Sequence, residues 1–404
     1  MIEVPLRRNR DFLLLQAGQL LSTFGSSMSS VAYPLLTLAV THSAARAGYV
    51  GAAVFAPLVL IGLPAGAAAD HFDRRRLMIA SDATGALALG VLAGAVATGH
   101  AAFWLILVVA FVDSSAGVVF RSGQSGAFRA VVPRSQLAAA ASAAQARQAT
   151  VRLAAPPVGG ALFGVARFAP FLSDACSYAF STASLLLMRT RFQEERDEMR
   201  ERPRLREGLA YFMQMPFLRA TIGMIAVSNF TFTALQLTLI VLAKRHGLSS
   251  ATIGGFVALV GATTLAGSFL SPLLRRAFTL RVILLSEFWA ALAYVAFLVY
   301  PSVYVLAAAL ATQAFCFPNT DSATTAYSYA LIPDHLLGRA MAASNTLRAA
   351  AAPLGPLAAG LLLGVLSVRA TVAIAMAATL VAAVLGTASH AIREAPNRLE
   401  DLPG

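Results

Sequence analysis

Apolar residues occur along this chain in long runs that are separated by short polar segments. A helix needs about 20 apolar residues to cross a bilayer, and twelve runs meet that requirement. In the first half the predicted spans are 12–40, 47–69, 77–98, 101–122, 137–165 and 169–189. In the second half they are 217–243, 250–274, 279–299, 302–324, 339–366 and 369–389. The pattern therefore predicts an all-α membrane protein with twelve transmembrane helices.

The second half of the sequence repeats the first at an offset of 200 residues. Val132-Pro133 aligns with Ile332-Pro333, and identical pairs follow without a gap. They are Leu137 and Leu337, Ala143 and Ala343, Ala149 and Ala349, Pro156 and Pro356, Gly160 and Gly360, and Leu162 and Leu362. Paired apolar halves are typical of secondary transporters, whose substrate site lies between the repeats. We expect two pseudo-symmetric six-helix bundles, 1–189 and 217–404, joined by a charged linker at 190–216.

The basic residues predict how the chain is oriented. One set of inter-helix segments is rich in arginine, including Arg7, Arg8, Arg10, Arg74, Arg75, Arg76, Arg129, Arg134, Arg275, Arg276, Arg281, Arg339, Arg393 and Arg398. The other set holds only Arg46, Arg167, Lys244, Arg245 and Arg369. Because cytoplasmic loops carry the excess of Lys and Arg, both termini and the linker are predicted to be cytoplasmic in a cell (plasma or inner) membrane. The first run extends to Val40, which is too long for the apolar region of a cleaved leader.

Composition supports this interpretation and excludes several functional classes. Hydrophobic residues make up 58% of the chain and charged residues 12%, about half the share usual in soluble domains. The net charge of +12 is therefore expected to form a belt at the inner membrane surface, not a nucleic-acid interface. Cys176 and Cys316 lie inside apolar runs, and no residues have metal-ligand spacing. The sequence has neither a Walker loop nor a catalytic constellation, so we expect no enzyme activity, no metal and no cofactor.

One polar loop carries a motif of a known family. It reads Gly66-Ala-Ala-Ala-Asp70-His-Phe-Asp73-Arg74-Arg75-Arg76. This resembles the G-x-x-x-D-R-x-G-R-K loop between helices two and three of the major facilitator superfamily. The loop and the segment that begins at Asn9 also resemble the enterobactin-exporter and macrolide-efflux branch. The resemblance implies a gating role for Asp70, Arg74 and Arg75; the alternative is that these charges only hold the loop inside.

Span five contains a second family motif, Ala155-Pro156-Pro157-Val158-Gly159-Gly160. It resembles the G-P-x-x-G-G motif in helix five of the superfamily's proton antiporters, although Ala155 replaces the first glycine. The resemblance implies export driven by protons and assigns Pro156, Pro157, Gly159 and Gly160 to a helix-bending antiporter motif. Small residues also let membrane helices approach closely, and proline bends a helix, so ordinary packing is the alternative.

Charged residues inside the predicted spans are candidates for coupling, because they are costly there. Asp113 in span four and Arg147 in span five lie roughly 15 Å from the inner ends of their helices, at a rise of 1.5 Å per residue. Arg152 is deeper, and it points about 140° away from Arg147. We expect Asp113 to carry the coupling proton, with Arg147 or Arg152 as its electrostatic partner. The alternatives are a structural ion pair or, for Arg152, an anionic substrate.

The remaining polar residues within the spans are weaker candidates. Those on helices that line the superfamily's cavity are Gln16, Gln19, Asn229, Gln236, Gln313, Asn319, Asp321 and Arg348. Each amide could instead make an interhelical hydrogen bond worth about 0.6 kcal/mol. Asp82, Asp174 and Glu287 lie on helices that are peripheral in the superfamily, where structural pairing is expected. The offset aligns Asp113 with Gln313, so proton chemistry is expected in the first half.

The predicted function is export of a small amphipathic organic compound, such as a drug, siderophore or secondary metabolite, in exchange for protons by alternating access. The expected partners are that substrate, protons and membrane lipids, but no nucleic acid, and the expected oligomeric state is a monomer. A lysophospholipid flippase or an uptake carrier of the same fold is the first alternative. A membrane sensor or scaffold without transport activity is the alternative from another class.

Overall fold

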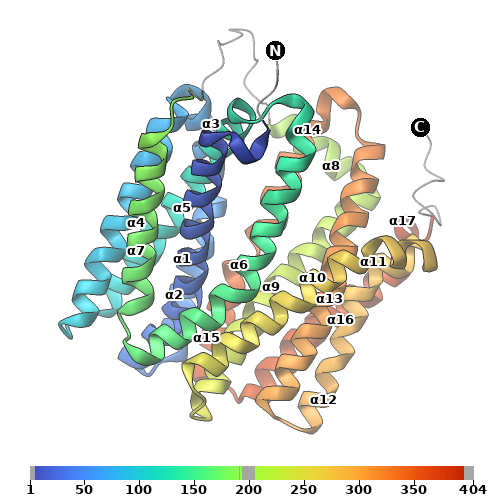
Figure 1. The fold of residues 1–404 in the computed structure, drawn as a ribbon. Coiled ribbons are helices and arrows are strands. Elements are labelled where there is room, and N and C mark those ends of the chain that lie inside the picture. Colours follow the sequence, from blue (N-terminus) through green and yellow to red (C-terminus); the bar gives the residue numbers. More distant parts are fainter. Residues whose placement is uncertain (1–4, 191, 193–204, 395–404) are drawn as a thin grey trace. The chain divides into compact units, whose positions relative to one another are not determined.

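The computed structural model describes residues 5–190, 192 and 205–394, and all regular secondary structure in these residues is helical (Figure 1). Its α-helices are α1 (Arg10–Thr41), α2 (Ala44–Leu60), α3 (Gly62–His71), α4 (Arg74–Ala97), α5 (Phe103–Val131), α6 (Leu137–Val165), α7 (Ala169–Leu187), α8 (Leu205–Gln214), α9 (Pro216–Arg245), α10 (Ser250–Ala277), α11 (Leu280–Trp289), α12 (Tyr294–Val299), α13 (Val303–Leu331), α14 (Asp334–Ala350), α15 (Leu354–Val365), α16 (Val368–Ala388) and α17 (His390–Arg393). Three short 3-10 helices are η1 (Leu6–Arg8), η2 (Arg134–Gln136) and η3 (Ala290–Ala293). The all-α prediction is confirmed.

Membrane-spanning candidates among the described residues number eight by length and apolarity. The helices α2 and α3, which are bent by 47° at Ile61, would together form a ninth. The long helices α1, α6 and α7 are not among them, because α1 and α7 carry many serine and threonine residues and α6 carries Gln145, Arg147, Gln148 and Arg152. The structure thus supports a multi-pass membrane protein, and the count of twelve spans stays a prediction.

The helices divide into two compact units. The first unit comprises residues 1–200 and 247–258, and the second comprises 201–246 and 259–404. Helix α10 therefore begins in the first unit and continues in the second. Part of the predicted linker, 191 and 193–204, lies outside the described residues. The predicted bundle boundaries stay predictions.

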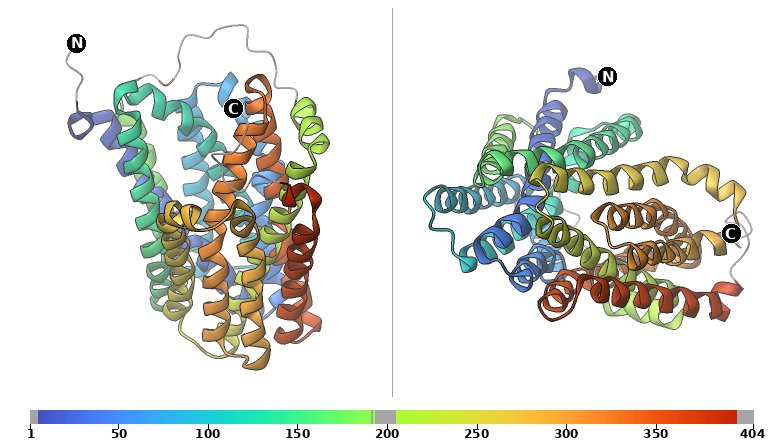
Figure 2. Two further views of the ribbon diagram at one scale, coloured as in Figure 1. Left: turned by 90° about the vertical axis from the view of Figure 1, so that its right-hand side faces the viewer. Right: turned by 90° about the horizontal axis from the view of Figure 1, so that it is seen from below.

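In the first unit, helix α1 is central and packs against α7, α6 and α2. Figure 1 shows these helices in blue to green, and the right view of Figure 2 shows the same helices from below. The contact between α1 and α7 follows from the sequence, because each helix carries a stripe of polar residues at helical spacing. On α1 the stripe is Ser22, Ser26, Ser29 and Tyr33, and on α7 it is Asp174, Ser177, Tyr178 and Ser181. The buried faces of the two helices are thus polar, which accounts for their lower apolarity.

The start of α1 is joined to the residues that follow α7 by Asp11, which is buried just before the predicted first span. Its Oδ2 atom accepts hydrogen bonds from the backbone N–H groups of Arg189 (3.1 Å) and Thr190 (2.7 Å) and from the Thr190 hydroxyl (2.5 Å). Burial alone would raise the pKa of Asp11. These hydrogen bonds and the positive charge of Arg10 outweigh it, so the pKa lies below its ordinary value. The carboxylate therefore holds the start of α1 beside the end of α7.

Replacing Asp11 with asparagine is expected to destabilise the protein at neutral pH but much less in acid. Because the folded pKa is lowered, the stabilisation is complete above the ordinary aspartate pKa of about 3.9 and is lost as the pH falls through the folded value. The measurement is thermal unfolding of wild type and Asp11→Asn in detergent between pH 7 and pH 3. A stability difference that does not change with pH would contradict this account.

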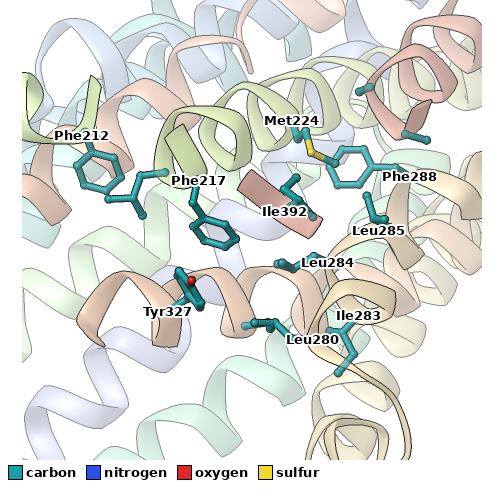
Figure 3. Packing of buried hydrophobic residues seen from close by; sticks show 14 of the residues in the cluster. Phe212, Phe217, Met224, Leu280, Ile283, Leu284, Leu285, Phe288, Tyr327 and Ile392 are labelled. Atoms are coloured by element: carbon teal, nitrogen blue, oxygen red, sulfur yellow. The ribbon is translucent and has the colours of Figure 1, made fainter. Parts of the chain in front are cut away.

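The second unit is arranged around helix α9, which packs against α15, α16, α14 and α13. At one end of α9, a hydrophobic cluster joins seven helices, α8, α9, α11, α13, α14, α16 and α17 (Figure 3). Its side chains include Phe212 of α8, Phe217 and Met224 of α9, Leu280, Ile283, Leu284, Leu285 and Phe288 of α11, Tyr327 of α13 and Ile392 of α17. The rings of Phe217 and Tyr327 have centroids 4.0 Å apart and are tilted by 38°. This cluster fixes α11 and α13 against α9, and all three helices carry buried polar residues of this unit.

Candidate functional site

Asp113 lies at the centre of a buried polar network in the first unit. It belongs to α5, and its side chain is almost fully buried. The Tyr33 hydroxyl of α1 donates a hydrogen bond to Oδ2 (3.0 Å), and the Tyr178 hydroxyl of α7 donates one to Oδ1 (2.9 Å). The Tyr178 hydroxyl also lies 3.0 Å from the Ser26 hydroxyl. The carboxyl is thus held by hydroxyl groups from two other helices, and its hydrogen-bond partners carry no positive charge.

A second carboxyl, Asp174 of α7, belongs to the same network. The Ser29 hydroxyl donates to its Oδ2 (2.6 Å), and the Ser177 hydroxyl donates to its Oδ1 (3.2 Å). Asp174 is fully buried and interacts electrostatically with Asp113. Sequence reasoning assigned Asp174 to structural pairing and did not connect it with Asp113. The signal that could have done so is the serine and tyrosine stripe on span one, whose helical spacing indicates a polar face opposite span six.

The close approach of α1 and α7 depends on Gly25. A Cβ atom at this position would lie 2.9 Å from the Asp174 Cα and 2.5 Å from the Ser177 hydroxyl oxygen. Real Cβ atoms do not approach other atoms so closely, and the Asp174 backbone cannot move away without displacing α7. Only glycine leaves the space that brings the two polar stripes into hydrogen-bond distance.

Arg147 of α6 binds amide groups in this structure. Its Nη1 donates to Gln16 Oε1 (2.6 Å) and Gln19 Oε1 (2.5 Å), both on α1. The structure therefore brings together three predicted site residues, Gln16, Gln19 and Arg147, but places Asp113 with a different set of partners. Arg147 Nε and Gln19 Nε2 are buried and have no hydrogen-bond partner within the described part of the chain. Arg152, one turn further along α6, is exposed. The coupling roles of these residues stay predictions.

The predicted gating residues lie where α3 ends and α4 begins. Arg74 forms an ion pair with Asp70 (3.7 Å), and its guanidinium group lies against Gly126 of α5. Asp73 caps α4 by accepting a hydrogen bond from the Arg76 N–H (2.9 Å). Arg75 donates to the carbonyls of Leu185 (3.0 Å) and Leu186 (2.9 Å), at the C-terminus of α7. A cation there is favoured by the negative end of the helix dipole.

The proline and glycine motif of α6 allows two close helix contacts within the first unit. A Cβ atom at Gly159 would lie 2.7 Å from the Met28 Cα of α1, and one at Gly160 would strike the Ser250 carbonyl at the start of α10. Gly254 of α10 likewise meets the Pro156 carbonyl, and Pro157 is adjacent to it. These positions allow the helices to pack closely. Their role in antiport stays a prediction.

In the second unit, Arg348 of α14 and Asp321 of α13 form an ion pair. Gln313 Oε1 accepts a hydrogen bond from the Tyr294 hydroxyl (2.6 Å), and Asn319 Nδ2 donates to the Phe315 carbonyl (3.2 Å). Gln236 is half-buried on α9. Two of the predicted cavity residues, Asp321 and Arg348, are thus brought together. The hydrogen bond of Gln313 joins α12 to α13, whereas that of Asn319 stays within α13, and the cavity roles of both stay predictions.

The predicted span 339–366, one of the eight candidates as Ala340–Val365, is interrupted by a turn at 351–353. Helix α14 ends at Ala350 and α15 begins at Leu354, with Pro353 between them and Pro356 one turn on. Proline lacks the N–H group, so backbone carbonyls at the break lose their helical donors. Helix α9 replaces them, because Asn229 Nδ2 donates to the Arg348 carbonyl (2.7 Å) and the Thr233 hydroxyl donates to the Ala352 carbonyl (3.0 Å). Asn229 therefore caps a broken helix, a role that the sequence did not reveal.

Replacing Asn229 with alanine is expected to destabilise the protein by about 1–3 kcal/mol, because it leaves the Arg348 carbonyl without a donor. The matched control is Gln236→Ala on the same helix, for which the described structure shows no hydrogen bond and a smaller loss is expected. Thermal unfolding of the purified variants measures both. Equal losses for the two variants would contradict the capping role.

Comparisons with known proteins agree with this architecture. Residues 4–399 match a family described as "Transmembrane secretion effector". A segment of 85 residues is 41% identical to the multidrug efflux pump Tap of Mycobacterium tuberculosis (strain ATCC 25618 / H37Rv), covering 21% of this chain and 20% of Tap. The uncharacterized MFS-type transporter YfiS of Bacillus subtilis (strain 168) is 25% identical over 227 residues, covering 54% of this chain and 53% of YfiS. The matched segments thus span about a fifth and about half of these relatives.

Solved structures of transporters show the same fold. A bacterial homologue of the human lysosomal transporter Spinster, in an inward-facing and unoccupied conformation, matches with a TM-score of 0.73 at 17% identity, covering 100% of this chain and 99% of its own. The nucleoside transporter NupG matches with a TM-score of 0.72 at 12% identity, covering 96% of this chain and 100% of its own. At these identities the likeness concerns the fold alone. With nearly its whole length matched by one family, the chain is a membrane transporter of the major facilitator superfamily, not an enzyme, and belongs to the transmembrane secretion effector family.

Proposed function

We propose that this transporter exports a small amphipathic organic compound in exchange for protons, with Asp113 as the proton carrier. The observation that carries the proposal is the environment of Asp113, a buried carboxyl held by the hydroxyls of Tyr33 and Tyr178. A charge without an opposite charge is costly in a membrane interior. A carboxyl in this setting therefore favours taking up a proton when it is sealed and releasing it when the surroundings open to water.

The tyrosine hydroxyls suit both protonation states of the carboxyl. When Asp113 is ionised, both hydroxyls donate to it, as the hydrogen-bond geometry allows. When it is protonated, one hydroxyl can rotate and accept the new O–H, because a phenol is both donor and acceptor. Tyr33 lies on α1, the helix that also carries Gln16 and Gln19. Movement of α1 would therefore change the contacts of Asp113 and Arg147 together.

The substrate is proposed to bind to the polar groups that the helices leave available. Arg147 Nε and Gln19 Nε2 are buried donors without partners in the described residues, and they could bind oxygen atoms of a substrate. Arg152 is exposed on the same helix and would favour an anionic group. The partial identity with a multidrug efflux pump supports export of organic compounds. Alternating access would follow from movement of the two repeated halves about a site at mid-membrane, in a monomer whose termini are cytoplasmic.

The test is transport by the purified protein in liposomes. Vesicles with an acidic lumen and an alkaline outside provide the proton gradient, and accumulation of fluorescent amphipathic dyes is followed over time. Gradient-dependent accumulation that collapses when a protonophore is added is the expected result. Movement that continues without a gradient but follows lipid asymmetry would instead support a lipid flippase. The absence of any gradient-dependent movement of dyes, siderophores or metabolites would reject the proposal.

A further inference from the structure

Glu287 is a buried acid in the second unit to which the proposed mechanism gives no role. It lies on α11, and only 1% of its surface is exposed. The Ser228 hydroxyl of α9 donates to its Oε1 atom. Its Oε2 atom is buried and has no hydrogen-bond partner among the described residues. The hydroxyl of Thr320 also interacts with Glu287, but in this structure it donates its hydrogen bond to the Ile283 carbonyl (3.2 Å). One oxygen of this carboxyl is therefore left without a donor.

The groups around Glu287 include one cation. Arg348 of α14 interacts electrostatically with Glu287, but its guanidinium group is paired with Asp321 of α13. The other ionisable groups that interact with Glu287 are Tyr294 of α12 and Cys316 of α13. Tyr294 donates its hydroxyl to Gln313. In the described residues, two carboxyls thus share a single guanidinium group.

The two carboxyls differ in exposure and in pairing. The side chain of Asp321 is 43% exposed and holds the guanidinium group of Arg348, whereas Glu287 is sealed inside the unit. A carboxylate that is paired with a guanidinium group can stay ionised at little cost. A buried carboxylate without its own cationic partner carries a desolvation penalty of several kcal/mol in a protein interior. The lowest free energy for this arrangement places the proton on Glu287.

We propose that Glu287 is a second proton-binding residue, which holds its proton while Arg348 is paired with Asp321 and releases it when Arg348 turns to Glu287. The proton leaves the carboxyl oxygen as the guanidinium group arrives, so the total charge of Glu287, Asp321 and Arg348 changes by one. The Ser228 hydroxyl stays as a donor in both states. Arg348 lies two residues before the end of α14, where the helix is interrupted before α15, so a change at that interruption would move the guanidinium group.

The direct test is infrared spectroscopy of the full-length protein with ¹³C-labelled glutamate carboxyls. Glu287 is the only glutamate within the predicted spans, so a labelled carboxylic-acid band from a dry environment belongs to it. The expected result is an isotope-sensitive band of a protonated carboxyl at neutral pH in the wild type. Asp321→Asn should remove this band at neutral pH, because Arg348 is then free to pair with Glu287.

Two further variants make the assignment secure. Glu287→Gln should remove the band, and Arg348→Gln should preserve it to higher pH than in the wild type, because no cation is left to favour the ionised form. The wild-type measurement needs no variant to fold, and size-exclusion chromatography checks each variant. Absence of the band in the wild type at neutral pH, or an unchanged band in Asp321→Asn, would overturn the proposal.

The inference extends proton coupling to the second unit, and its spectroscopic test does not require that transport be proton-driven. In liposomes, Glu287→Gln should reduce gradient-driven accumulation at least tenfold while exchange of substrate at equal pH persists. If the wild type shows the labelled band but no gradient-driven transport, the proposed function fails and the second proton site stands. If transport is proton-driven and the band is absent, the proposed function stands and the second proton site is rejected.

Discussion

Replacing Asp113 with asparagine is expected to reduce gradient-driven transport to the level of empty liposomes while the protein still folds. The amide keeps the size of the carboxyl and can accept a hydrogen bond from Tyr33 or Tyr178, but it cannot bind and release a proton. The free energy of unfolding should therefore fall by about 1 kcal/mol, the usual net contribution of one hydrogen bond. The measurement is dye accumulation under a pH gradient, with thermal unfolding recorded for the same preparation.

Two controls separate a proton-carrying role from a structural one. Asp82→Asn removes another buried acid of the first unit, on α4, which lies outside the Asp113 network and should leave coupling intact. Exchange of substrate across membranes at equal pH should persist in Asp113→Asn, because it needs no net proton movement. If Asp113→Asn transports at the wild-type rate under a gradient, Asp113 is not the carrier. If Asp82→Asn is equally inactive, loss of a buried acid has a general effect.

Replacing Gly25 with alanine is expected to destabilise the first unit by about 1–3 kcal/mol or more, the range found when well-packed cores receive an extra group. The new Cβ atom would overlap the space of Asp174 and Ser177, so α1 and α7 would have to separate. Separation would also lengthen the hydrogen bond between Ser29 and Asp174. We therefore expect a lower unfolding temperature and a lower yield of monodisperse protein.

The matched control for Gly25→Ala is Gly90→Ala. Gly90 lies inside α4, and a Cβ atom there would meet no heavy atom within 4 Å. Alanine is a better helix former than glycine by about 0.5–1 kcal/mol, so this variant should be as stable as the wild type or slightly more. The two variants make the same chemical change at helical positions. Similar unfolding temperatures for both would contradict the close-packing account.

The helices could be predicted from the sequence because apolar runs of membrane length are a local property of the chain. The breaks were harder to predict, since Pro57, Gly62 and Pro353 lie inside runs that are otherwise continuous. The span predicted at 47–69 is bent at Ile61, and the one at 339–366 is interrupted after Ala350. Hydropathy alone does not distinguish a bent helix from a straight one.

The partners of the site residues could not be predicted, because they come from distant parts of the chain. Asp113 is held by Tyr33 and Tyr178, which are 80 and 65 residues away, and Arg147 by Gln16, 131 residues away. Depth within the membrane suggested that Asp113 and Arg147 could meet, but depth says nothing about which face of a helix each residue occupies. For Asp113, this information lies in the polar stripes of α1 and α7, because they mark the helix faces that carry Tyr33 and Tyr178.

The hydrogen bonds of Asp11 also bear on chain connectivity. They place the beginning of α1 against the residues that follow α7, so the stretch from α1 to Thr190 is a segment whose two ends meet. Domains with adjacent ends tolerate circular permutation, because a short linker can join the old ends while new ones are opened in a loop. The turn between α4 and α5, at residues 98–102, is a suitable place for such new ends. The order in which these helices are synthesised is therefore separable from the order in which they pack.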